Sequence, residues 1–230
     1  SWELAQRPEG VSTVASGPLR GRTLAALAAA DRNAFWGTNC GTGDFPLLVK
    51  LIDAKRDLSI QVHPSDETAL RAQGEAGKAE LWYVVDCDAD AAIYFGLARQ
   101  VTPEELRRRA EDGTICQVLN RVPVHPGDTF FIRPGTIHAI CAGILVAEGY
   151  TAAELLACRY FRVDRLDVDG RAALRCDGGS FRHLLCVAGE GAVVHGGVGY
   201  PLRQGDSYFL PAALGDYAVE GRCRVLLSRV

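Results

Sequence analysis

The sequence predicts a mainly β protein made of two tandem jelly-roll barrels with a few short helices. Much of its 230 residues consists of short β-branched and aromatic runs interrupted by Gly, Pro or Asp. Such punctuation is typical of sandwiches and barrels. The chain also repeats itself, because the pattern of residues 127–140 returns in residues 205–219. Two copies of one β-unit predict two barrels, one after the other along the chain.

The two copies match in their turns as well as in their strands. Gly127-Asp-Thr-Phe-Phe-Ile-Arg-Pro134 corresponds to Gly205-Asp-Ser-Tyr-Phe-Leu-Pro211. Further upstream, residues 81–96 correspond to residues 183–197. A Gly-Asp turn into each strand and a Pro-containing turn out of it are typical of cupin-like jelly rolls.

The repeat also predicts the domain organisation. We expect residues 1–150 to form an N-terminal cupin domain, with a helical insertion near residues 102–112. Residues 151–230 are expected to form a C-terminal cupin-like barrel, and the boundary is expected near residues 149–160.

Three short helices are expected from capping signals. Thr23 precedes an Ala/Leu-rich run, and Ser65 precedes a shorter candidate through residues 68–72. The strongest start is Thr102-Pro103-Glu104-Glu105, which has an N-cap residue, a Pro at the first helical position and a Glu three residues after the cap. Asp112-Gly113 then ends this helix.

The intervening segments read as strands. Residues 46–52 and 58–63 are apolar or alternating runs separated by a polar turn. Residues 81–85 and 91–96 are expected to form a hairpin around the acidic turn at residues 86–90.

Composition excludes several classes of function. A net charge of −3 and an isoelectric point near 6.0 leave no basic excess for binding a nucleic acid duplex. No apolar run approaches the ~18–20 residues that span a membrane, and no signal-peptide pattern opens the chain. The eight cysteines contain no C-x-x-C pair and are interpreted as reduced residues of a cytoplasmic protein. Because the sequence has no Met, we expect it not to begin at its native start.

A set of metal-binding side chains falls within the first β-unit. Ser59, Gln61 and His63 share one face of the expected strand, because residues two apart project to the same side. Glu80 opens the next strand, and His138 follows a Pro-Gly turn. Imidazole nitrogen with carboxylate and amide oxygen suits a borderline divalent metal such as Zn²⁺.

Taken singly, each of these residues has a simpler interpretation. An inward histidine is more often a hydrogen-bonded core residue, Gln61 could satisfy backbone groups, and Glu80 could pair with Lys78. Their joint placement favours a metal site. The second β-unit has Phe181 near the place of Glu80 and Asp216 near the place of the second histidine, so the fold alone does not require the ligands.

Five segments connect this sequence with a known family: Ser1-Trp-Glu-Leu, Phe45-Pro-Leu-Leu-Val-Lys50-Leu-Ile-Asp-Ala-Lys, Leu58-Ser-Ile-Gln-Val-His-Pro64-Ser-Asp-Glu, Gly77-Lys-Ala-Glu80-Leu-Trp-Tyr and Pro134-Gly-Thr-Ile-His138-Ala-Ile. Over nearly its whole length the chain resembles the type I mannose-6-phosphate isomerases in their short bacterial form. The resemblance implies one zinc ion per chain with four ligands: Gln61, His63, Glu80 and His138. It also implies polar active-site residues at three positions: Lys50, Lys78 and Glu148.

The same resemblance implies a reaction and a substrate. The family interconverts mannose 6-phosphate and fructose 6-phosphate through a cis-enediol, with zinc as a Lewis acid. From its position Glu148 is our candidate for the proton shuttle, although a salt-bridged carboxylate at the rim is the simpler interpretation. Lys50 and Lys78 would offset the substrate charge, and Ser59 would contact the substrate. We expect a monomer or a homodimer.

One stretch departs from the family. Where relatives have Gln-Gln-x-Ser-Asp-x-Thr-x-Arg, this chain continues from Glu148 as Gly-Tyr-Thr-Ala-Ala-Glu-Leu-Leu-Ala-Cys-Arg159. Arg159 belongs to the following element and does not replace the family arginine. Two explanations remain open, namely residues missing from this sequence and a shortened relative with weak or no activity.

Two rival functions follow from this departure. A non-catalytic, metal-retaining cupin that binds sugar phosphates would keep the ligands without the arginine stretch. A metal-dependent cupin oxygenase ranks last, because such sites use a denser histidine set and Gln61 takes one ligand position here.

Overall fold

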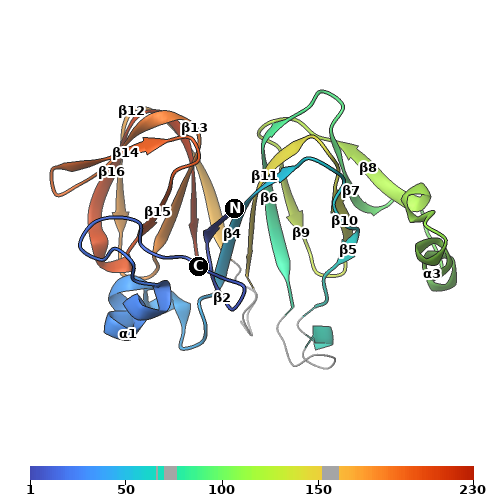
Figure 1. Cartoon of the computed structure of the whole chain (residues 1–230), viewed down its shortest axis with the longest axis horizontal. Coiled ribbons are helices and arrows are strands. Elements are labelled where there is room, and N and C mark those ends of the chain that lie inside the picture. Colours follow the sequence, from blue (N-terminus) through green and yellow to red (C-terminus); the bar gives the residue numbers. More distant parts are fainter. Residues whose placement is uncertain (66, 70–76, 152–160) are drawn as a thin grey trace. The chain divides into compact units, whose positions relative to one another are not determined.

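The structure is a computed structural model that describes residues 1–65, 67–69, 77–151 and 161–230 (Figure 1). It confirms a mainly β protein. By contacts the chain forms two compact units, one of Ser1 with residues 50–154 and the other of residues 2–49 with residues 155–230. The predicted division at residue 150 stays a prediction, and the grouping by contacts differs from it in assigning residues 2–49 to the second unit.

The first unit consists of two antiparallel sheets around one core. Within this unit one sheet has the strand order β4 (Leu47–Ala54, which enters the unit at Lys50), β11 (Ile144–Thr151), β6 (Ala79–Cys87) and β9 (Thr129–Ile132). The other has the order β5 (Gln61–Val62), β10 (Ile137–Ile140), β7 (Ala92–Leu97) and β8 (Leu119–Pro123). Both sheets contribute to one buried cluster, for example through Trp82, Ile93, Ile132, Ile140 and Val146. The pattern is a β-sandwich whose alternate residues point into a common interior.

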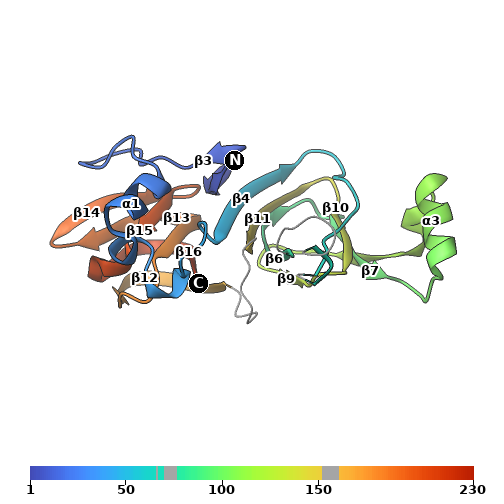
Figure 2. The same ribbon diagram turned by 90° about the horizontal axis from the view of Figure 1, so that it is seen from below.

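The predicted helical insertion is confirmed as α3 (Pro103–Glu111). Thr102 caps it, because its hydroxyl accepts a hydrogen bond of 3.2 Å from the backbone N–H of Glu105. The helix buries none of its residues, and Figure 2 shows it projecting away from the sheets of its unit. It is followed by the short 3₁₀ helix η2 (Ile115–Val118).

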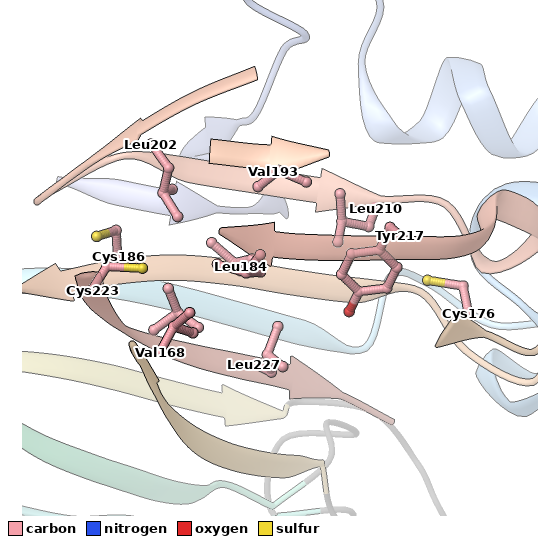
Figure 3. Close-up of a cluster of buried hydrophobic side chains, with 12 residues drawn as sticks. Val168, Cys176, Leu184, Cys186, Val193, Leu202, Leu210, Tyr217, Cys223 and Leu227 are labelled. Carbon is pink, nitrogen blue, oxygen red and sulfur yellow. The ribbon is translucent and has the colours of Figure 1, made fainter. Parts of the chain in front are cut away.

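The second unit is one sheet of long strands with a helical cover. Its order is β12 (Arg162–Cys176), β16 (Gly215–Arg229), β13 (Arg182–His195) and β14 (Val198–Arg203), and β15 (Ser207–Leu210) also pairs with β13. Alternate side chains on these strands meet in a buried cluster, labelled in Figure 3, which includes Leu184, Cys186 and Leu202. The described cysteines are free thiols, in agreement with the prediction of reduced residues.

Residues 2–49 complete this unit with short elements: β1 (Trp2–Leu4), β2 (Gln6–Arg7), β3 (Gly10–Val11), α1 (Leu24–Phe35) and η1 (Thr38–Cys40). The short helix η3 (Ala212–Leu214) belongs to the same unit. Thr23 caps α1 as predicted, and Leu24 and Leu27 are the buried residues of that helix. Among the helices in the described part of the chain, none has the length and apolar character needed to cross a membrane.

Two predicted strand arrangements are wrong. Residues 81–85 and 91–96 do form strands, but β6 and β7 lie in different sheets, so they are not a hairpin. The connection at Asp88–Ala91 carries the chain across the sandwich instead of turning it back beside itself. The strand expected over residues 58–63 is reduced to Gln61–Val62. For the helix expected after Ser65, residues 67–69 are helical and residues 70–72 lie outside the described part.

The predicted internal repeat is reproduced in backbone hydrogen bonds. In the first unit the N–H of Gly127 donates to the carbonyl of Val84 at 2.8 Å. In the second unit the N–H of Gly205 donates to the carbonyl of Cys186 at 2.9 Å. The two Gly-Asp turns therefore meet equivalent residues of β6 and β13, so Val84 in one sequence repeat aligns with Cys186 in the other.

Candidate metal centre

Three ionisable side chains from separate segments converge inside the first unit. Glu80 on β6 is almost fully buried, His138 on β10 is buried, and His63 directly follows β5. Their ligand atoms all lie within 4.8 Å of one another. Glu80 Oε1 is 3.0 Å from His63 Nε2, and Glu80 Oε2 is 3.6 Å from His138 Nε2. The structure thus brings together three of the four predicted ligands.

The facing atoms in this cluster fit a bound cation. His63 Nε2 and Glu80 Oε1 are buried and lie 3.0 Å apart, although the geometry between them is not that of a well-oriented hydrogen bond. The Lys78 ammonium already contacts Glu80 Oε1, which shows that this oxygen accepts a positive charge, and a divalent ion between the ring nitrogen and the carboxylate would interact with both. The donor set of two imidazoles and a carboxylate is one that zinc commonly takes.

His138 is oriented for the same purpose. Its Nδ1 is 2.8 Å from the backbone carbonyl oxygen of Thr136, so Nδ1 carries the proton and donates it to that oxygen. The other ring nitrogen, Nε2, is then the free lone pair that faces Glu80. A carbonyl that fixes the tautomer of a ligating histidine is a common feature of metal sites.

The charges of the cluster favour the forms that bind metal. Burial opposes ionisation of Glu80, but the His63 imidazole and the Lys78 ammonium outweigh it and lower the pKa of Glu80 to about 2. The Lys78 ammonium also contacts Glu80 Oε1 directly. Burial lowers the pKa of His138, which keeps that ring neutral near pH 7. A carboxylate and a neutral imidazole are the ligand forms required.

Gln61 lies beside this group without being buried. Within the pairing of β10 and β5 it stands directly opposite His138, and paired residues of an antiparallel ladder project to the same face. Its side chain is exposed, and its amide nitrogen donates a 2.7 Å hydrogen bond to the hydroxyl of Ser59. This bond orients the amide and leaves its oxygen as the atom that could bind a metal. The assignment of Gln61 as a ligand stays a prediction.

A second pair of charges adjoins the ligands. Glu148 on β11 pairs with Trp82 of β6 and projects to the same face as Glu80. Its carboxylate is 3.5 Å from the Lys50 ammonium. Burial and the neighbouring charge of Glu80 raise the pKa of Glu148, and the two lysines oppose the rise without cancelling it. A buried carboxyl with a raised pKa next to a metal site is suited to exchanging protons near neutral pH.

Two contributors to the site were not predicted from the sequence. Trp82 donates an indole hydrogen bond of 3.2 Å to Glu80 Oε2, and Thr136 supplies the carbonyl that orients His138. The sequence spacing could have indicated Trp82, because this residue is two positions from Glu80 on the same strand and therefore projects to the same face. The role of Thr136 depends on a backbone atom, which the side-chain pattern does not reveal.

The second unit repeats strand pairings of the first unit but lacks its metal-ligand residues. Glu80 pairs with Ile132 in β6 and β9, and Arg182 pairs with Leu210 at the equivalent place in β13 and β15. The residue equivalent to Glu80 is therefore Arg182, one position beyond the predicted Phe181. Within the described residues the only cluster of His, Cys, Asp and Glu side chains suited to a metal is the one in the first unit.

Comparisons with known families match both ends of the chain. The family profile described as phosphomannose isomerase type I, catalytic domain, matches residues 1–81. The profile described as mannose-6-phosphate isomerase, cupin domain, matches residues 151–230. The first match includes His63 and Glu80 but not His138, and the second covers β12 to β16 of the unit that lacks the ligands.

Individual relatives agree with these profiles. Mannose-6-phosphate isomerase ManA of Bacillus subtilis is 32% identical over an alignment that covers 100% of this chain and 88% of the relative. A mannose-6-phosphate isomerase of Streptococcus mutans is 39% identical over 74% of this chain and 52% of its own length. The crystal structure of the mannose 6-phosphate isomerase from Bacillus subtilis has a TM-score of 0.88 and 30% identity, and covers 100% of this chain and 88% of that chain.

A more distant structure shows the same fold. A variant of phosphomannose isomerase from Salmonella typhimurium has a TM-score of 0.78 at 14% identity and covers 96% of this chain and 88% of that chain. The alignment with ManA runs over 283 positions, whereas this chain has 230 residues. The difference, 283 minus 230, means that at least 53 positions of the alignment have a residue in the relative and none here.

Proposed function

This chain is an isomerase of the type I mannose-6-phosphate isomerase family, and we propose that it interconverts mannose 6-phosphate and fructose 6-phosphate at a zinc ion. The observation that carries the proposal is the convergence of His63, Glu80 and His138, whose ligand atoms all lie within 4.8 Å of one another. We propose Gln61 as the fourth ligand, because it faces the same side as His138 across the ladder.

The metal and the protein would divide the chemistry between them. When bound, zinc supplies Lewis-acid polarisation of substrate oxygens, which stabilises the negative charge that develops as a cis-enediol forms. Glu80 and the two histidines hold the ion, and the Thr136 carbonyl keeps His138 in the ligating tautomer. Two proton transfers remain: a hydroxyl proton passes between O2 and O1, and a carbon-bound proton passes between C2 and C1, which requires a base.

Glu148 is the group that we propose for this transfer. It is buried on the same face as the ligand Glu80, and its raised pKa gives the carboxylate more basicity than a solvated one. Its carboxylate would take the proton from one carbon and, as the carboxylic acid, return it to the neighbouring carbon. The Lys50 ammonium at 3.5 Å holds the carboxylate in place and limits the rise of its pKa.

The polar residues around the site are proposed to receive a charged substrate. Lys50 and Lys78 are each about a fifth exposed, with side-chain values of 20% and 22%, so both ammonium groups reach the edge of the buried cluster. Their positive charges would offset the negative charge of a sugar phosphate. Ser59 and Gln61 are exposed next to the ligands and linked by a hydrogen bond, so the Ser59 hydroxyl could meet a sugar hydroxyl.

The proposal is tested by following product formation in the zinc-loaded protein. We expect fructose 6-phosphate to form from mannose 6-phosphate, detected by phosphorus NMR, with mannose lacking the phosphate turned over far more slowly. Turnover of neither compound by protein that carries zinc would contradict the isomerase function. If calorimetry then shows that mannose 6-phosphate still binds, the chain is the non-catalytic cupin.

That second candidate has one observation in its favour. The relative ManA carries at least 53 aligned positions that this chain lacks, and the arginine-bearing stretch expected after Glu148 is absent from this sequence. A site with its metal ligands and without the arginine would retain binding and lose rate. The turnover measurement above therefore decides between the two functions.

A further inference from the structure

Trp82 contacts two of the three convergent ligands at once. Its indole N–H donates to Glu80 Oε2 at 3.2 Å. Its ring also meets the His138 imidazole edge to face, with centroids 5.4 Å apart and planes at 75°. The side chain is only 2% exposed and belongs to the core cluster of the first unit, so its position is fixed by packing.

The hydrogen bond distinguishes the two oxygens of the Glu80 carboxylate. Oε2 accepts from Trp82, whereas Oε1 lies 3.0 Å from His63 Nε2 and contacts the Lys78 ammonium. Oε2 also lies 3.6 Å from His138 Nε2. The bond from Trp82 therefore fixes which carboxylate oxygen faces each histidine, and removing the donor would let the carboxylate rotate.

We propose that Trp82 is a positioning residue for the metal: its N–H sets the orientation of Glu80, and its ring restrains His138. The inference rests on the proposed zinc site and goes beyond it by assigning a role to a core residue that binds neither zinc nor substrate. Partners of this kind typically change metal affinity by about 10- to 100-fold when they are removed.

The chain offers a closely matched control. Trp36 is also buried, at 3% exposure, and its indole N–H donates to the Leu24 carbonyl at 3.2 Å, the same distance as in the bond from Trp82. It lies in the other unit and contacts no ligand residue named here. Trp82→Phe and Trp36→Phe therefore remove the same group from similarly buried surroundings.

The test measures zinc affinity by competition with a chromophoric chelator, together with the visible spectrum of the cobalt-loaded protein. We expect Trp82→Phe to weaken zinc binding about 10- to 100-fold and to alter the cobalt spectrum, because the Glu80 carboxylate is then free to rotate. Trp36→Phe should change neither. Equal zinc affinity in the wild type and in Trp82→Phe, or equal weakening by both variants, would overturn the inference.

A second substitution keeps the test valid if Trp82→Phe does not fold. Replacing Trp82 by β-(3-benzothienyl)alanine preserves the shape of the indole and removes only the N–H donor. The same loss of affinity is expected, and unchanged affinity would again overturn the inference. A wild-type protein that binds no zinc would instead remove the proposed function, a result distinguishable from zinc binding that does not depend on Trp82.

Discussion

Glu80 and Arg182 occupy equivalent positions in the two β-units and carry opposite charges. The Glu80 carboxylate faces His63, whereas the Arg182 guanidinium donates hydrogen bonds to the backbone carbonyls of Ser180 and Phe181 at 2.9 and 3.2 Å. One unit thus presents a ligand for cations where the other presents a cation. The second unit keeps the Gly-Asp turn and the strand register, so the ligands are separable from the fold.

The opposite charges predict a single metal ion per chain. Arg182 would repel a divalent cation at the only equivalent position in the second unit, whereas the first unit holds the convergent ligands. Metal analysis of the zinc-saturated protein should give one zinc per chain. A second tight ion would show that the second unit binds metal in some other way.

His138→Ala should abolish stable zinc binding. The substitution removes one of three converging ligands and leaves Glu80 without the imidazole 3.6 Å from its Oε2. The matched control is His125→Ala, because the His125 side chain is 79% exposed. Zinc content after dialysis should fall to background in the first variant and stay at one per chain in the second. Full zinc occupancy in His138→Ala would refute the ligand assignment.

Glu148→Gln should separate proton transfer from substrate binding. Glutamine preserves the shape of the side chain but cannot take a proton from carbon, so kcat is expected to fall about 100- to 10,000-fold with KM and zinc content nearly unchanged. In the wild type, activity should fall as the pH drops through the pKa of Glu148, which lies above the usual value. A variant that keeps most of its kcat would assign the proton to another group.

The same substitution should stabilise the fold at neutral pH. Because the folded state raises the pKa of Glu148, it binds the proton more tightly than the unfolded chain does. The contribution of this group to stability is therefore greatest below its unfolded pKa and is lost as the pH rises through the folded value. Thermal denaturation of metal-free protein should show a higher Tm for Glu148→Gln at pH 7 and no advantage near pH 3.

His183 predicts an acid sensitivity that originates in the second unit. Complete burial lowers the pKa of His183 from 6.5 to about 3, so the folded state resists protonation. The contribution of neutral His183 to the free energy of unfolding is full above pH 6.5 and is lost as the pH falls toward 3. Over that range the free energy of unfolding changes by at most about 1.4 kcal/mol per pH unit because of this group.

The measurement for His183 is the stability difference between variants across pH. Denaturant unfolding of His183→Gln should depend less steeply on pH between 6.5 and 3 than the wild type, whatever its absolute stability. His125→Gln, at an exposed position, should follow the wild type. If the free energies of unfolding of the wild type and His183→Gln fell in parallel with pH, His183 would not be the source of the acid sensitivity.

Local chemistry made much of this molecule predictable. Thr23 and Thr102 begin helices because their hydroxyls cap exposed backbone N–H groups, which depends on nearest neighbours alone. The Gly127 and Gly205 turns were recognisable because each requires a glycine with positive φ, 98° and 90° respectively. The histidines and the acidic ligand were found because few structural roles combine these residue types.

What could not be predicted depends on contacts distant in the sequence. Alternating residues identify β6 and β7 as strands but do not say which strands pair with them, so the hairpin over residues 81–96 was wrong. The grouping of residues 2–49 with the second unit has no local signal either. The bond from Trp82 to Glu80 depends on the rotamers of two side chains, which packing decides.

A zinc titration of the metal-free chain, with bound metal and turnover of mannose 6-phosphate followed in the same samples, tests the central claim most directly. Activity should rise in proportion to bound zinc and level off at one ion per chain, and His138→Ala should show neither binding nor turnover. Turnover that persists without metal, or one zinc bound per chain with no turnover, would contradict an isomerase site built on His63, Glu80 and His138.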